Sequence, residues 1–306
     1  MNRMRTGILL AAATAVISGV SIFINSSAVK ALPDPATFTT LKNGMAAMAL
    51  FVVAVPLLRM RGGSLRMSRR DAGWLTLIAV IGGSVPFLLF FTGLSMASAP
   101  SAAFIQKTLF IWVALLAVPL LGERLGWLQI GALGVLLASQ LLIAPPTGVT
   151  WGIGETMIGA ATILWAIEVI LAKRLLARVN PLVVGVGRLG IGLIVLVGYL
   201  ALTGKLSGIA ALDGSQWSWV LLTGLLLAGY VGTWFSALSL APATVVTSVL
   251  VLGAPITALL DAFVNGRIPG TLPLAGYGLI TLGAVALVVA TFRARPQAHP
   301  TQYVTS

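Results

Sequence analysis

The chain has 306 residues and a mass of 31.7 kDa, with 58% apolar residues, 8% charged residues and a mean hydropathy of +1.03. A soluble globular domain has about 25% charged residues, so this composition excludes a surface that faces water on all sides. The net charge of +12 would suggest nucleic acid as a partner of a soluble chain, but here we expect a lipid bilayer and no nucleic acid. The absence of cysteine excludes disulfides, thiolate metal sites and cysteine nucleophiles. We expect neither a metal nor a cofactor.

Ten apolar runs are long enough to cross a bilayer, which needs about 20 residues in a helix. They cover residues 6–24, 39–58, 72–94, 101–121, 126–144, 153–172, 181–202, 217–239, 243–263 and 272–292. No connection between them has room for a folded soluble domain, which excludes an ATP-driven pump with its motor in the same chain. We therefore predict an all-α integral membrane protein with ten transmembrane helices. The basic start of the first run also admits a cleaved signal peptide, which would leave nine spans.

The distribution of positive charge predicts the orientation. With ten spans both termini lie on one side, and the segments on that side carry 13 Lys and Arg against three on the other. The main group is Arg59, Arg61, Arg66, Arg69 and Arg70. By the positive-inside rule both termini are cytoplasmic, in the inner membrane of the cell. Residues 293–306 are rich in Pro, Gln and Thr and are predicted to be a disordered cytoplasmic tail.

The two halves of the chain show the same landmarks in the same order. Pro35 and Lys42 match Pro181 and Arg188 at an offset of 146, and Gly122-Glu123-Arg124-Leu125 resembles Asn265-Gly266-Arg267-Ile268. That alignment puts Gly266 opposite Glu123. Because each half holds an odd number of spans, we predict two inverted five-helix repeats, residues 1–146 and 147–292, with a substrate site between them.

Two segments carry a family resemblance: GLSMASAP at residues 93–100 and PLLGERLGWLQIGALGVLLAS at residues 119–139. They resemble the EamA-type drug/metabolite transporter (DMT) superfamily, and in overall texture the chain is most similar to the YddG-type aromatic amino acid exporters. The resemblance implies a transporter whose third, fourth, eighth and ninth helices line a central cavity. It also implies the outward direction of transport.

Ionisable side chains inside a span cost about 2.5–3.5 kcal/mol at the centre, so each one is a functional candidate. Lys107 is predicted to hold a substrate carboxylate. Asp261 is expected to pair with Lys42 or Lys107, and Glu168 with Arg188, as gate or ion-pair residues. A simple anchoring role stays open for Lys42 and Arg188, because long basic side chains can reach the interface.

Aromatic side chains in the spans predict a cavity that accepts large apolar groups. The candidates are Phe87, Phe91, Phe104, Trp112, Trp165, Tyr230 and Trp234. Helix packing or lipid contact is the alternative for each of them. Pro86 and Pro255 interrupt candidate cavity helices and are predicted hinges.

These features predict a monomeric secondary transporter that exports small metabolites, most of all aromatic or other apolar amino acids, by alternating access. The alternative is a proton-coupled exporter of drugs or cationic metabolites with the same fold, in which Glu168 would bind cation and proton in turn. Clustered Lys and Arg, which phosphate carriers need, are absent from the spans. An enzyme is disfavoured because the sole histidine, His299, lies in the tail, and the GxGxxG match at residues 185–190 lies in an apolar span without a preceding strand. A channel or receptor remains a further alternative.

Overall fold

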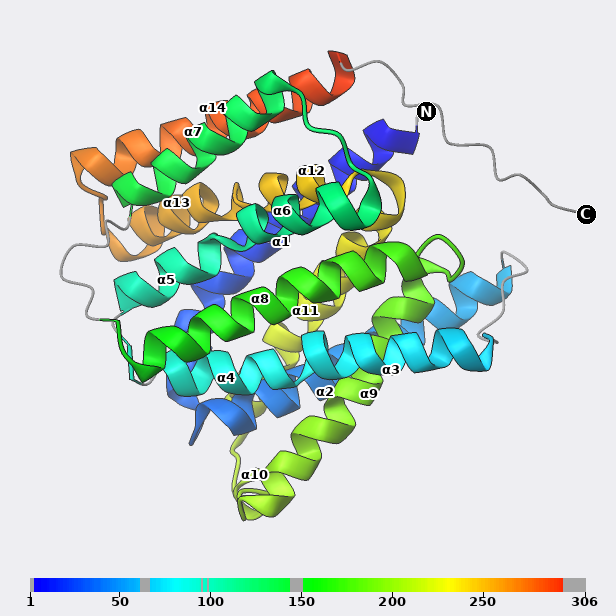
Figure 1. Ribbon diagram of the computed structural model, residues 1–306. Helices are drawn as coiled ribbons and strands as arrows, with labels where there is room; N and C mark the ends of the chain where they lie inside the picture. The colour runs from blue at the N-terminus through cyan, green and yellow to red at the C-terminus, as the bar shows by residue number, and fades with distance from the viewer. Residues whose placement is uncertain (1–2, 61–66, 95, 98, 144–150, 294–306) are drawn as a thin grey trace, which may run out of the picture.

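The structure is a computed structural model that describes residues 3–60, 67–94, 96–97, 99–143 and 151–293. Within these residues the chain is helical and forms no strand, and its helices pack into one bundle (Figure 1). Arg61, Arg66, the predicted repeat boundary at 146/147 and the predicted tail beyond Arg293 lie outside the described residues.

The long helices alternate in direction along the chain, with α3–α4, α5–α6 and α12–α13 each continuing in one direction (Figure 1). In the first half they are α1 (Arg3–Ala31), α2 (Pro35–Met60), α3 (Arg69–Gly83), α4 (Val85–Leu94), α5 (Ala99–Lys107), α6 (Leu109–Leu121) and α7 (Trp127–Ile143). In the second half they are α8 (Ile153–Leu175), α9 (Pro181–Leu202), α10 (Ser207–Ala210), α11 (Gly214–Leu240), α12 (Ala243–Leu250), α13 (Gly253–Asn265) and α14 (Thr271–Arg293). Among the described residues, nine segments are long and apolar enough to span a membrane when α3–α4, α5–α6 and α12–α13 are each taken as one. The 17 residues of α7 make a shorter apolar helix.

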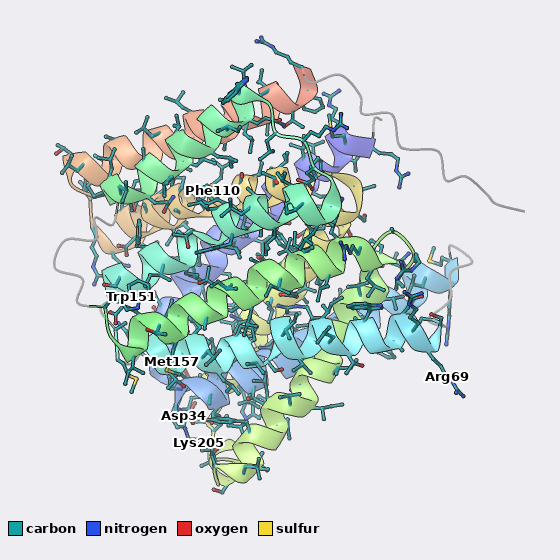
Figure 2. The ribbon with its side chains drawn as sticks, in the orientation of Figure 1. Asp34, Arg69, Phe110, Trp151, Met157 and Lys205 are labelled. Carbon is teal, nitrogen blue, oxygen red and sulfur yellow. The ribbon has the colours of Figure 1, made fainter. Side chains whose placement is uncertain are left out.

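The bundle has two ends, which Figure 2 marks by the labelled residues Arg69 and Trp151. We name them the Arg69 end and the Trp151 end. The start of α1 and the end of α14 lie at the Arg69 end (Figure 1). Asp34 and Lys205 lie toward the other end (Figure 2).

The helix contacts of the first half recur in the second. Helix α1 packs on α11 as α8 packs on α4, and α2 packs on α11 as α9 packs on α3. Helix α1 also packs on α12 and α13, as α8 packs on α5 and α6. Two pairs, α2 with α9 and α7 with α14, join corresponding helices of the two halves, and α6 packs on α12 between the corresponding segments α5–α6 and α12–α13. The halves are therefore packed about an approximate two-fold relation.

Helix α1 belongs to the packed core of the bundle. A Cβ at Gly7 would lie 2.9 Å from the Cβ of Ala241, and one at Gly19 would lie 2.7 Å from the Cβ of Ile256. The Thr14 hydroxyl also donates to Thr233 Oγ1 on α11 at 2.8 Å. Small residues permit such close approach between membrane helices, where lipid gives no hydrophobic drive to association.

Three of the predicted continuous spans are broken into two helices each. Between α3 and α4 the Ser84 hydroxyl donates to the carbonyl of Val80 at 3.1 Å, and between α5 and α6 the Thr108 hydroxyl donates to that of Ile105 at 2.6 Å. The third break precedes Gly253, where α13 begins. Pro86 and Pro255 lie in the first turns of α4 and α13, positions where a missing N–H costs no helical hydrogen bond. Both predicted hinge prolines thus lie directly after a helix break.

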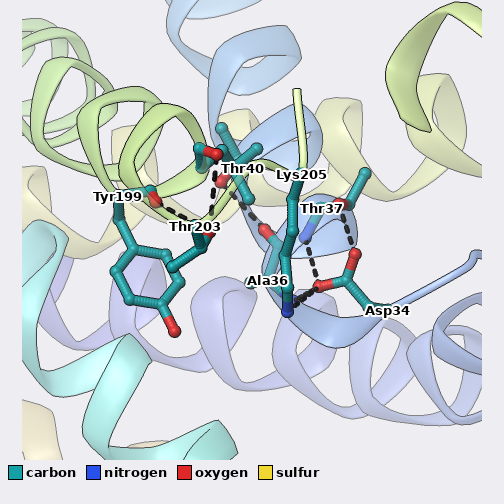
Figure 3. A network of polar contacts seen from close by, with 8 residues as sticks. Asp34, Ala36, Thr37, Thr40, Tyr199, Thr203 and Lys205 are labelled. Carbon is teal, nitrogen blue, oxygen red and sulfur yellow. Dashed lines mark hydrogen bonds and ion pairs between the residues drawn. The ribbon is translucent and has the colours of Figure 1, made fainter. Parts of the chain in front are cut away.

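A polar network ties the two halves together at the Trp151 end (Figure 3). The Asp34 carboxylate accepts hydrogen bonds from the backbone N–H of Ala36 at 3.0 Å and of Thr37 at 3.2 Å. It also accepts from the Thr37 hydroxyl at 2.5 Å and from Lys205 Nζ, in the second half, at 3.2 Å. Burial acts to raise the pKa of Asp34, but the bonds from Thr37 and Lys205 outweigh it, so the pKa is lowered.

Candidate functional site

A central cavity of about 260 Å³ lies among α1, α4, α5, α6, α8, α9, α11 and α12. Its polar lining consists of Ser18, Ser21, Gln106, Lys107, Glu168, Arg188 and Thr247. Its aromatic lining consists of Phe87, Phe110, Trp165, Tyr230, Trp234 and Phe235, of which Phe110 is labelled in Figure 2. A few polar groups in an otherwise apolar wall are typical of a small-molecule site.

A second cavity of about 530 Å³, the vestibule, adjoins the central one. Ile22 and Lys107 line both cavities. From there the vestibule reaches Asp261 and Arg267 at the Trp151 end of α13. The two cavities together form a route from the middle of the bundle toward that end.

The aromatic rings of the central cavity come from both halves. Phe87 and Trp165 meet edge to face with ring centroids 5.4 Å apart, and Tyr230 stacks on Trp234 at 5.9 Å. The Trp165 indole N–H donates to the Gly82 carbonyl at 3.1 Å, which fixes the ring. These rings offer flat apolar faces to a bound molecule.

An ion pair between Arg188 on α9 and Glu168 on α8 lines the same cavity. Arg188 Nε donates to Glu168 Oε1 at 2.5 Å and Nη2 donates to Oε2 at 3.3 Å. Nη2 also donates to the Gly82 carbonyl at 2.8 Å. The side chains are 9% and 6% exposed. The pair places a positive and a negative group side by side in an apolar setting.

Gly82 is the reason why the ion pair fits between the helices. A Cβ at this position would lie 2.0 Å from Glu168 Cδ and 2.3 Å from its Oε2. The end of α3, before its break at Ser84, thereby contributes backbone alone to the pair. Glu168 and Arg188 are thus held by three helices.

Lys107 is the last residue of α5, directly before the break at Thr108. Among the described residues it has no hydrogen bond or ion pair. Its ammonium group lies at the C-terminal end of a helix, where the macrodipole favours positive charge. The central cavity is thus lined by two positive side chains, Lys107 and Arg188, and one negative side chain, Glu168. This charge balance favours a ligand with a carboxylate.

Three predicted cavity residues lie elsewhere. The Phe91 ring packs edge to face on Phe90, with centroids 5.5 Å apart, and Phe104 packs against a separate apolar cluster that includes Ile158. Trp112 is 40% exposed, and its N–H donates to the Thr108 hydroxyl at 3.1 Å. Each is on a predicted cavity helix, but the rotation of the helix turns it away from the cavity.

The other predicted charges also have different surroundings from those expected. Lys42 lines neither cavity, and its Nζ lies 5.5 Å from the ring centroid of Phe38 on its own helix. Asp261 lies 3.9 Å from Arg267 and accepts a hydrogen bond from Asn265 at 2.6 Å. Asp261 therefore pairs with a cation just beyond its own helix, and with neither predicted lysine.

Comparison with known proteins shows the family. Residues 5–144 and residues 152–289 each match the EamA-like transporter family. The chain belongs to this family. Members of the EamA-like family are membrane transporters of the DMT superfamily, and the two matches show that this multi-pass membrane protein holds two copies in tandem. No curated protein matches the sequence.

A protein of known crystal structure shares the fold of this EamA-like chain. The two have 18% sequence identity and a TM-score of 0.76 over 93% of this chain and 98% of the other. At this identity the likeness concerns the fold alone.

Two sets of site residues in this EamA-like transporter were not predicted from the sequence. The first set is Ser18, Ser21 and Ile22, which face the cavity at helical spacing on α1. Two hydroxyl groups at i and i+3 in an apolar run could have indicated this face of the helix. The second is Glu123, at the Arg69 end. Glu123 accepts from the backbone N–H of Ala243 at 2.5 Å and of Thr244 at 3.1 Å, in a contact across 120 residues that no local pattern indicates.

Proposed function

We propose that this EamA-like protein exports aromatic or other apolar amino acids. The observation that carries the proposal is the central cavity, where Arg188, Glu168 and Lys107 lie among Phe87, Trp165, Tyr230 and Trp234. The likeness of the sequence to the YddG-type exporters supports the same substrate class and the outward direction.

The charges of the cavity fit a zwitterion. A carboxylate finds two cations, Arg188 and Lys107, and an ammonium group finds one anion, Glu168. A ligand with both groups can exchange partners with the buried pair, so that neither protein charge is left uncompensated, a state that costs several kcal/mol in a buried site. An aromatic side chain then packs against the rings, which adds about 0.5–1.5 kcal/mol beyond area burial.

The mechanism that we propose is alternating access of two inverted five-helix repeats, residues 1–146 and 147–292. The repeated packing pairs and the opposite directions of α1 and α8 support this assignment. In it all ten predicted segments cross the inner membrane, with α7 as the shortest. The Arg69 end, which holds most of the arginines, is cytoplasmic together with both termini. The vestibule then opens to the outside, and the protein works as a monomer.

A proton-coupled exporter of drugs or cationic metabolites is the second candidate, because Glu168 lines the cavity. Such a carrier needs a carboxylate that a cation and a proton can occupy in turn. Here Arg188 already neutralises Glu168 at 2.5 Å, and Lys107 adds a further positive charge. The electrostatics of the cavity therefore favour the amino acid.

Counterflow in proteoliposomes tests the proposal. Vesicles are loaded with unlabelled phenylalanine, threonine, a sugar phosphate or a cationic dye, and uptake of the labelled counterpart is followed with and without a pH gradient. We expect trans-stimulated uptake of phenylalanine that does not depend on the gradient. Dye uptake that requires the gradient and is lost in Glu168→Gln would instead establish the second candidate.

A further inference from the structure

The two ends of the bundle differ in one pair of corresponding charges. Helices α6 and α13 each have 13 residues, and each ends at a glycine in the left-handed conformation, Gly122 with φ 68° and Gly266 with φ 67°. These glycines correspond at an offset of 144, as do the starts of α5 and α12. The structure thereby corrects the sequence alignment by one residue, and the counterpart of Glu123 is Arg267.

We infer that the opposite charges at residues 123 and 267 determine which end of the carrier is open at rest, with Glu123 holding the Arg69 end closed. This inference rests on the alternating access proposed above. Neither the fold nor the cavity requires the charge difference between Glu123 and Arg267.

Closure of the Arg69 end rests on two charges that fit the ends of two helices. The Glu123 carboxylate binds the first two N–H groups of α12, where the macrodipole is positive. Lys173 on α8 donates to the carbonyl of Ala241 at 2.7 Å and to that of Leu238, at the negative end of α11. Together they hold the turn between α11 and α12. Close packing at a glycine does not distinguish the ends, because Gly7 of α1 lies against Ala241 as Gly154 of α8 lies against Ala97.

Neither interaction has a counterpart among the residues that the structure describes at the Trp151 end. Its corresponding turn joins α4 to α5, and the residue that corresponds to Glu123 is a cation that the positive start of a helix would repel. Arg267 is 77% exposed and lies 3.9 Å from Asp261, on the wall of the vestibule. The counterpart of Lys173 at an offset of 146 or 147 is Ser27 or Ser26, which carries no charge. The vestibule lies open at the end where the attraction is missing.

Cysteine accessibility tests the inference without any substrate, because the chain has no cysteine of its own. Ser26→Cys reports on the vestibule, which Ser26 lines, and Thr244→Cys reports on the Arg69 end, where Thr244 is fully buried. The rate of alkylation of the purified protein by a hydrophilic maleimide is measured for each. In the parent background we expect Ser26→Cys to react fast and Thr244→Cys slowly.

Charge variants should move the two rates in opposite directions. Glu123→Gln should raise the Thr244→Cys rate about five-fold and lower the Ser26→Cys rate, since a charge at a helix terminus contributes about 1 kcal/mol. Arg267→Glu, at an exposed site that tolerates substitution, should lower the Ser26→Cys rate by a similar factor even if Glu123→Gln fails to fold. The exposed neighbour variant Arg124→Gln is the control and should change neither rate.

Unchanged rates in both charge variants would overturn the inference. A response at the altered end without the opposite response at the other end would support the charge assignment and contradict alternating access. A substrate other than an amino acid would alter the counterflow result but none of these rates, so the two proposals fail separately.

Discussion

Gly82→Ala tests the buried ion pair by adding one methyl group and removing no charge. The new Cβ would lie 2.0 Å from Glu168 Cδ, and ordinary contact between carbon atoms is about 3.5 Å, so the carboxyl group must retreat by about 1.5 Å. Its hydrogen bond to Arg188 Nε, now 2.5 Å, then breaks. Hydrogen bonds to charged groups contribute about 1.5–3 kcal/mol, so we expect phenylalanine counterflow to fall about ten-fold or more at low substrate concentration.

The assay compares initial counterflow rates in proteoliposomes that hold equal amounts of monodisperse protein. Gly198→Ala on α9 is the matched control, because a Cβ there meets nothing within 4 Å. Glu168→Gln, which removes the charge without steric change, should lose transport as Gly82→Ala does. Counterflow by Gly82→Ala that equals that of Gly198→Ala would refute the argument that the geometry of this pair supports transport.

Substitutions at Lys107, Trp234 and Lys205 test three further contacts. Lys107→Met should raise the KM for phenylalanine about ten- to hundred-fold, because it removes a charged hydrogen bond to the carboxylate; an unchanged KM would exclude that contact. Trp234→Leu should weaken binding of phenylalanine about two- to ten-fold, whereas Trp112→Leu, at an exposed ring, should leave it unchanged, and equal effects would contradict the assignment of the cavity. The lowered pKa of Asp34 means that its stabilising contribution is complete above the unfolded value of 3.8 and is lost as the pH falls through the lower folded value. Unfolding followed against pH should show this acid loss, at most about 1 kcal/mol because the pair is partly exposed, and Lys205→Gln should reduce it.

The sequence predicted the coarse features of the fold well, because they follow from composition and period. Ten apolar runs of about 20 residues leave too little polar surface for a chain in water, and they have the length of membrane-spanning helices. The ordered landmarks indicated the repeat that the two family matches show. The breaks at Ser84 and Thr108 were not predicted. At both breaks a hydroxyl group donates to a backbone carbonyl, but Thr162 makes the same kind of bond within the unbroken α8, so the residue type alone does not indicate a break.

The cavity was harder to predict than the helices that form it. Both Trp165 and Trp112 were predicted as cavity residues from their residue type. The rotation of each helix decides the outcome, because Trp165 lines the cavity and Trp112 is exposed. The role of Glu123 depends on α12, which is 120 residues away in the sequence. Its true counterpart, Arg267, emerged only when the left-handed turns at the ends of α6 and α13 fixed the alignment.

In the proposed transporter, the cavity recognises both charged groups of an amino acid. This recognition can be measured by competition against counterflow of labelled phenylalanine. The competitors are phenethylamine, which lacks the carboxylate, and 3-phenylpropanoate, which lacks the ammonium group. We predict that each analogue competes about ten-fold or more weakly than phenylalanine, since each loses a charged hydrogen bond. Phenethylamine that competes as well as phenylalanine would contradict this recognition and favour a carrier of cations.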